Sequence, residues 1–66
     1  MANRIKEMRE QRKITLRELA SESNISAPYL LDLENNRRGA RPETLARIAE
    51  ALGVTVEELT EEQKAG

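Results

Sequence analysis

The chain has 66 residues, enough for one domain with a small core, because a chain of this size buries only about 60% of its extended surface. It lacks cysteine, histidine and any apolar run near the roughly 20 residues of a membrane span, which excludes disulfides, thiolate or imidazole metal sites and membrane insertion. The net charge is −1, but the charges are unevenly distributed along the chain. Residues 1–41 carry nine Lys and Arg against six Asp and Glu (+3), and residues 42–66 carry two Lys and Arg against six Glu (−4). This division suits a protein that docks on phosphate through one face, or equally a mixed solvated surface.

A first helix is predicted over roughly residues 4–12, with Asn3 as its cap and with Ile5, Met8 and Arg12 on one stripe. Ile14 then follows and is expected to turn inward. Nothing at the start of the chain is typical of a signal peptide, so a cytoplasmic location is expected.

The second predicted helix begins at Leu16, because Thr15 and Glu18 have the spacing of a capping box. It ends near Ser23. Asn24 is the expected turn residue, since Asn tolerates the left-handed backbone conformation better than any residue except Gly.

The third predicted helix is capped by Ser26, has Pro28 in its first turn and runs to about Asn35. The stretch 15–35 thus contains two short helices joined by a tight turn, with the second helix offered to solvent. This is the plan of a helix-turn-helix.

A loop rich in cations separates this unit from a fourth helix, which Pro42 opens and Gly53 ends. Its apolar stripe comprises Leu45, Ile48, Ala49 and Leu52. Thr55 and Glu58 form a second capping box, which starts a short fifth helix expected to bury Val56 and Leu59. Residues 60–66 are expected to form a polar, frayed tail.

The sequence resembles the phage repressor and Cro family of helix-turn-helix proteins, also called the XRE family. The matching residues are Ile5, Met8, Arg9, Ile14, Thr15, Leu19, Ala20, Asn24, Ile25, Ser26, Tyr29, Leu30, Leu33, Glu34, Asn35, Arg41, Pro42, Thr44, Leu45, Ile48, Ala49, Ala51, Leu52, Gly53 and Val54. Among them, Ala20, Asn24, Leu30 and Leu33 match the inward positions of the motif. The resemblance covers about residues 3–59. It implies an all-α, compact five-helix, lambda-repressor-like DNA-binding domain over residues 1–66, with the helix-turn-helix at helices two and three.

The resemblance implies that helix three lies in the DNA major groove, where Ala27, Pro28, Leu31 and Asp32 would face bases. Ala27 can contact a thymine methyl group and Asp32 can accept from cytosine N4, whereas the other two offer apolar contact only. None can form a bidentate pair with guanine or adenine. We therefore expect few base-specific hydrogen bonds, so that sequence selectivity depends mainly on methyl contacts and DNA shape.

A second set is expected to contact phosphates or the minor groove: Leu16, Arg17, Ser26, Tyr29, Asn36, Arg37, Arg38 and Arg41. Leu16 stands where relatives usually carry Gln, so backbone amides and Arg17 would supply that contact, unless Leu16 simply packs against the first helix. For Tyr29 the alternatives are a phosphate contact by its hydroxyl or partial core burial. The arginine loop is either a phosphate grip, with Arg41 reaching a minor groove, or a solvated basic loop.

The resemblance also implies a structural ion pair between Arg9 and Glu34, which would be buried and would orient the loop. We predict a sequence-specific double-stranded DNA-binding transcriptional regulator, within that class a repressor, acting as a homodimer on a pseudo-palindromic site. Its dimer surface would use Val54, Val56 and Leu59, unless these are core residues.

The alternative is a protein-interaction module, such as an antitoxin or adaptor, because helix three is unusually apolar for a base reader. Catalysis is not expected, since the carboxylates lie on solvent faces with capping roles and no Gly-rich phosphate loop accompanies them. No metal, cofactor or small-molecule ligand is expected either.

Overall fold

The computed structural model describes residues 3–60, which form five α-helices and no strand. The helices are α1 (Ile5–Gln11), α2 (Leu16–Glu22), α3 (Ala27–Glu34), α4 (Pro42–Leu52) and α5 (Val56–Thr60). The all-helical prediction and the order of the helices are confirmed. Most of the predicted polar tail lies outside the described residues, but Thr60 belongs to α5. Within residues 3–60, no helix combines the length and the apolar character that crossing a bilayer requires.

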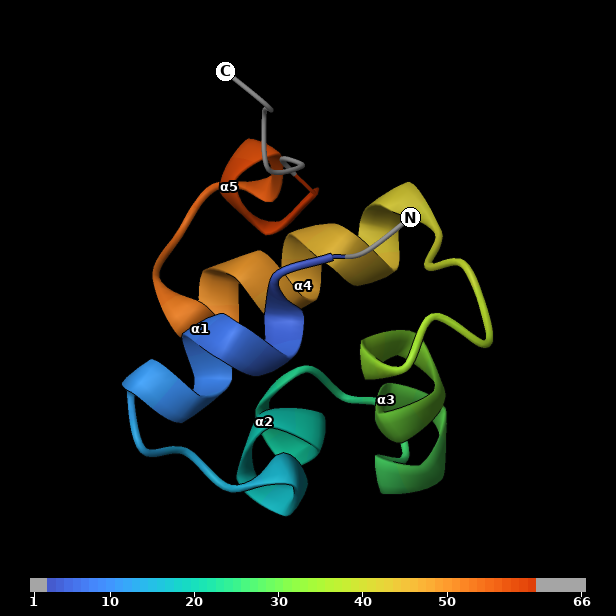
Figure 1. The fold of residues 1–66 in the computed structure, drawn as a ribbon, viewed down its shortest axis with the longest axis horizontal. Coiled ribbons are helices and arrows are strands. Elements are labelled where there is room, and N and C mark those ends of the chain that lie inside the picture. The colour runs from blue at the N-terminus through green and yellow to red at the C-terminus, as the bar shows by residue number, and fades with distance from the viewer. Residues whose placement is uncertain (1–2, 61–66) are drawn as a thin grey trace.

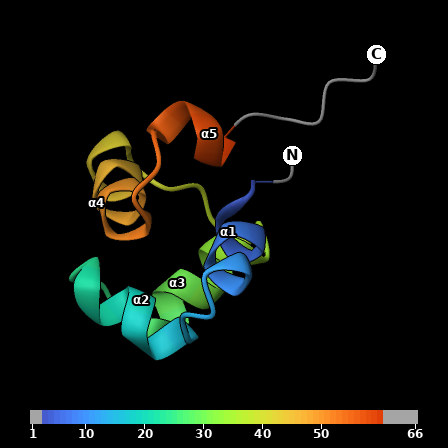
Figure 2. The ribbon, with the colours of Figure 1, turned by 90° about the vertical axis from the view of Figure 1, so that its left-hand side faces the viewer.

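The five helices fall into two groups that α1 joins (Figures 1 and 2). On one side lie α2 and α3, which pack against each other, and on the other lie α4 and α5. Helix α1 packs against α3, α4 and α5, and α2 also contacts α4. The loop after α3 runs along the outside from the first group to the second.

Every helix gives the core at least one side chain that is 0% exposed: Ile5, Leu19, Leu30, Ile48 and Leu59. Burial of each such side chain contributes roughly 1.5–3 kcal/mol, so the five helices depend on one another for stability.

Two predicted core positions differ from the structure. Val56 is only half-buried, and so is Leu45, whereas Thr44 beside it is buried at 8% exposed. The buried stripe of α4 therefore begins one residue earlier than the apolar pattern indicates.

The predicted helix starts are confirmed by their hydrogen bonds. The Thr15 hydroxyl accepts from the Glu18 amide (3.1 Å) and the Glu18 carboxylate accepts from the Thr15 amide (2.9 Å). Thr55 and Glu58 repeat both bonds at α5. At α1 the cap is displaced: Arg4 occupies the N-cap position, and Asn3 Oδ1 accepts from the Ile5 amide (3.0 Å).

Four helices end at a residue with positive φ: Lys13, Asn24, Asn36 and Gly53. After each helix, two amides bond back to carbonyls of its last turn in the Schellman pattern; for α3, Asn36 N–H donates to Leu33 O (3.2 Å) and Arg37 N–H to Asp32 O (2.9 Å). The predicted left-handed turn at Asn24 is confirmed, with φ 62°. Its assignment to an inward position was wrong, because the side chain is exposed and only the backbone matters there.

Two long-range bonds near the N-terminus join the helix groups. Asn3 Nδ2 donates to the carbonyl of Leu33 at the end of α3 (2.7 Å). The next amide, of Arg4, donates to the carbonyl of Leu59 in α5 (2.8 Å). The start of α1 thereby fixes the end of α3, where the cationic loop begins.

Candidate nucleic-acid interface

The end of α3 is also anchored by the ion pair between Arg9 and Glu34. Arg9 Nε and Nη2 donate to the two Glu34 carboxylate oxygens at 2.7 and 3.3 Å, and Nη1 donates to the carbonyl of Ile14 at 2.9 Å. The Glu34 side chain is 1% exposed and that of Arg9 13%. Hydrogen bonding to Glu34 raises the pKa of Arg9 above its ordinary value, against a smaller opposing effect of desolvation. The predicted buried pair is present, and it ties α1, the start of α2 and the end of α3 together.

The outward face of α3 is mostly apolar. Pro28 is exposed, and Leu31, at 42% exposed, is the one large hydrophobic side chain classed as exposed among residues 3–60. Ala27 is half-buried and packs against the core, so it presents less surface than predicted. Of the four residues predicted to face bases, two are therefore exposed, Pro28 and Leu31.

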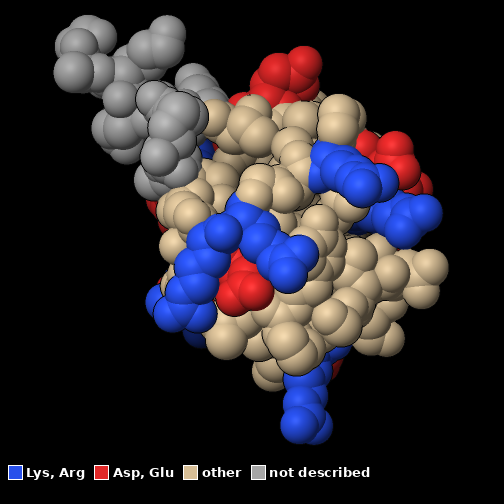
Figure 3. Space-filling view, turned by 90° about the vertical axis from the view of Figure 1, so that its right-hand side faces the viewer, with Lys and Arg blue, Asp and Glu red and all other residues tan. Residues whose placement is uncertain are grey.

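Asp32, the fourth of these residues, is paired within the protein. Its Oδ1 lies 3.5 Å from Arg37 Nη1 and its Oδ2 lies 3.6 Å from Arg38 Nε. The two arginine side chains are 67% and 64% exposed, against 33% for Asp32. Figure 3 views the face formed by α3 and the following loop, and shows acidic atoms lying between cationic side chains.

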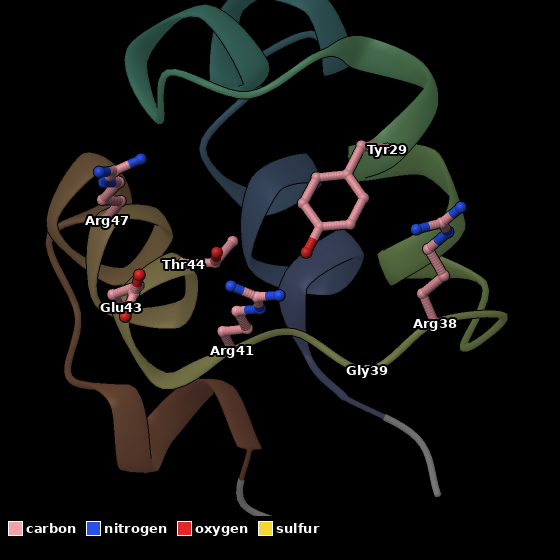
Figure 4. Close-up of a pocket in the computed structure, with 7 residues that line it drawn as sticks. All are labelled: Tyr29, Arg38, Gly39, Arg41, Glu43, Thr44 and Arg47. Carbon is pink, nitrogen blue, oxygen red and sulfur yellow. The ribbon is translucent and has the colours of Figure 1, made fainter.

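A groove of about 490 Å³ separates α3 from the start of α4 (Figure 4). Its lining residues are Tyr29, Arg38, Gly39, Arg41, Glu43, Thr44 and Arg47. The Arg38 guanidinium lies 5.8 Å from the centre of the Tyr29 ring, within cation–π range. The Tyr29 hydroxyl points toward Arg41 across the groove. Because the ring is half-buried and its hydroxyl reaches the groove, both of the roles considered for Tyr29 agree with its position.

The other residues of the predicted phosphate-contacting set lie apart from this groove. Leu16 is half-buried against the core, as the packing alternative requires, and Arg17 beside it is exposed. The Ser26 hydroxyl is exposed and accepts from the Tyr29 amide (3.2 Å), so it caps α3. Asn36 has a structural role, because its left-handed backbone ends α3 and its Oδ1 accepts a hydrogen bond from Asn3 Nδ2 (3.1 Å).

Four groove residues were absent from the predicted set: Gly39, Glu43, Thr44 and Arg47. Arg41, Thr44 and Arg47 are spaced by three, which places them along one face of α4. That spacing was a usable signal. Arg47 was instead counted with the acidic part of the chain, where its charge is outnumbered.

Within residues 3–60, no group of His, Cys, Asp or Glu side chains is arranged to hold a metal ion. The interface offers arginine side chains in the groove and the exposed apolar residues of α3. Arginine guanidinium groups recognise phosphate oxygens through paired hydrogen bonds, and apolar side chains can contact base methyl groups.

Known proteins of similar sequence are regulators. A transcriptional regulator of Deinococcus deserti, DdrOP3, is 39% identical over 61 residues, which are 92% of this chain and 47% of that protein. The immunity repressor of Bacillus phage phi105 is 38% identical over 63 residues, 96% of this chain and 44% of that protein. The chain thus spans less than half the length of these two relatives.

Solved structures agree with this comparison. The N-terminal DNA-binding domain of SinR from Bacillus subtilis superposes with a TM-score of 0.84 and 28% identity, covering 94% of this chain and 91% of that one. A structure of SinR in complex with DNA gives a TM-score of 0.77 and 29% identity, with coverage of 82% and 87%. The family HTH_3, described as helix-turn-helix, matches residues 5–59. The chain belongs to this helix-turn-helix family.

Proposed function

We propose that this chain is a sequence-specific, double-stranded DNA-binding transcriptional regulator, and within that class a repressor. It inserts α3 into the major groove of double-stranded DNA and reads a particular sequence. Family membership, the regulators and repressor among its relatives, and the DNA complex of SinR support this proposal.

The observation that carries the proposal is the groove beside α3. Three arginines line it, Arg38, Arg41 and Arg47, against one carboxylate, that of Glu43. A helix placed in the major groove brings its flanking residues onto the phosphate backbone, which fixes the register of the protein. The groove would receive a backbone phosphate there, with the Tyr29 hydroxyl as a further donor.

In this proposal α3 makes few base-specific contacts. Pro28 and Leu31 offer apolar contact to thymine methyl groups, and Asp32 is the one charged group on the outward face of α3. Since no side chain there forms a bidentate pair with a purine, DNA shape would contribute much of the selectivity.

We further propose that two copies bind a pseudo-palindromic site with their α3 helices about 34 Å apart, one turn of the duplex. Leu59 was predicted at the dimer surface, but it is fully buried within one chain and cannot contact a second copy. Val54 and Val56 are half-buried and keep some surface for such a contact.

A protein-interaction module remains the second candidate. Its support in the structure is the exposed apolar pair Pro28 and Leu31. Two residues form a much smaller surface than the apolar patches of a few hundred Å² that mark partner sites. DNA binding is therefore the function that the interface supports best.

The test is fluorescence anisotropy on a DNA sequence selected from a random pool, at several salt concentrations. Changing Arg41 and Arg47 together to Ala should weaken binding and reduce the salt slope by about 2, because each lost phosphate contact removes about one released counterion. Lys6→Ala on α1 removes one cation outside the groove and should change neither. Binding by the double variant that equals wild type would overturn the groove's assignment, and the absence of any selected sequence would favour the protein-interaction module.

A further inference from the structure

The pairing of Asp32 with the loop arginines follows from how α3 ends. Asn36, in the left-handed conformation, turns the chain back, and the Arg37 amide donates to the Asp32 carbonyl at 2.9 Å. The loop thus returns over the residue that it left one turn earlier. This path brings Arg37 and Arg38 to opposite oxygens of one carboxylate, at 3.5 and 3.6 Å.

These two contacts are weak enough to exchange. Both distances exceed those of good charge-assisted hydrogen bonds, and both guanidinium groups are about two-thirds exposed. Water screens such pairs, so they contribute little to stability. They still matter for binding, because one negative charge sits between two cations that lie beside the helix proposed to enter the major groove.

Asp32 therefore has two alternative kinds of partner, the loop arginines and a DNA base. In the free protein its carboxylate forms ion pairs with the two loop arginines. On DNA, its position on α3 would let it meet a base edge. Cytosine N4 and adenine N6 are donors and can attract the carboxylate, whereas guanine O6 and N7 and thymine O4 are acceptors and repel it.

We propose that Asp32 is a specificity-determining residue that couples base identity to the phosphate grip of Arg37 and Arg38. A base that donates to Asp32 draws its carboxylate away and leaves both arginines to the DNA backbone. A base that only accepts leaves Asp32 on the arginines and lowers their effective charge. This inference rests on the proposed function, because it requires α3 in the major groove of DNA.

The variant that tests it is Asp32→Asn, which keeps the size of the side chain and removes its charge. The probes are the duplex selected by the wild-type protein and a scrambled duplex of equal length, with anisotropy measured over a range of salt. For wild type, the salt slope on the selected duplex should exceed that on the scrambled one by about 1–2, since one or two more phosphate contacts form there.

For Asp32→Asn, the slopes on the two duplexes should become equal. Binding to the scrambled duplex should tighten by about 10-fold, and the ratio of the two affinities should fall by a similar factor. Glu57→Gln on α5 is the matched control, because it removes one negative charge from a helix that packs on α4 and α1. It should leave slopes and ratio as in wild type.

A second background shows whether the arginines carry the effect. When Arg37 and Arg38 are both Ala, adding Asp32→Asn should no longer tighten binding to the scrambled duplex. An equal gain in that background, or an unchanged slope for Asp32→Asn alone, would overturn the coupling while the proposed function stood. A wild-type chain that selects no sequence from the random pool would overturn both. Circular dichroism melting curves confirm that each variant is folded.

Discussion

Arg9→Ala is the substitution to which the fold should be most sensitive among its arginines. It removes three hydrogen bonds, two to Glu34 and one to the Ile14 carbonyl, and leaves the Glu34 carboxylate at 1% exposure without its cation. Breaking a buried ion pair by deleting one partner costs about 3–5 kcal/mol. A domain of this length has a total stability of roughly 3–10 kcal/mol, so the loss is comparable to the whole.

The assay is thermal and urea denaturation followed by circular dichroism. Because 1 kcal/mol corresponds to about 4–8 °C in a domain of this size, the Tm of Arg9→Ala should fall by more than about 12 °C. Arg12→Ala is the matched control: Arg12 is exposed on the same helix end, and its side chain makes one 3.3 Å bond to the Met8 carbonyl. Its Tm should change by only a few degrees, because exposed side chains contribute little.

A double variant distinguishes the cost of losing the ion pair from the cost of leaving Glu34 buried without a cation. Replacing Arg9 by Met and Glu34 by Gln removes both charges together. It should recover part of the stability lost in Arg9→Ala, because the uncompensated buried carboxylate is gone. The reasoning would be refuted if Arg9→Ala melted within about 2 °C of wild type.

Three further substitutions test local features of the fold by the same denaturation assay. Lys13→Gly should raise the free energy of unfolding by about 0.5–1 kcal/mol, because Lys13 has φ 56°. As a comparison, Asn24→Gly should raise it less, since Asn tolerates that conformation. A lower free energy of unfolding for Lys13→Gly would contradict this reasoning. Ser23→Ala should leave stability unchanged or raise it by about 1 kcal/mol, because the buried Ser23 Oγ has no hydrogen-bond partner among residues 3–60; a loss above about 1 kcal/mol would indicate a hidden partner. Thr15→Ala should cost about 1 kcal/mol through the lost capping box, and no change would mean that α2 starts without it.

The sequence alone determined where most helices begin and end. Thr15 with Glu18, and Thr55 with Glu58, satisfy helix amides through bonds that span three residues, so neither depends on the rest of the fold. Gly53 and Asn24 end helices for an equally local reason, their tolerance of positive φ. The left-handed Lys13 was unpredictable in that way, because its side chain has no such preference. The turn there is held by backbone bonds, from the Lys13 amide to Glu10 O (3.0 Å) and from the Ile14 amide to Arg9 O (3.1 Å).

The tertiary structure decided which side chains share a partner. The family resemblance implied that Asp32 faces a base, and only the path of the loop after Asn36 shows that it pairs with Arg37 and Arg38. The Arg9–Glu34 pair was expected from resemblance to a family and not from any spacing, since its members lie 25 residues apart.

The groove beside α3 gives the same lesson. Tyr29 and Arg47 lie on different helices, and they line one groove only because of the way α4 packs against the helix-turn-helix. Bonds between neighbours in sequence can be predicted from the residues alone, because both partners lie within a few residues of each other. A site assembled from separate helices depends on the packing of the core, where buried residues from all five helices set their relative positions.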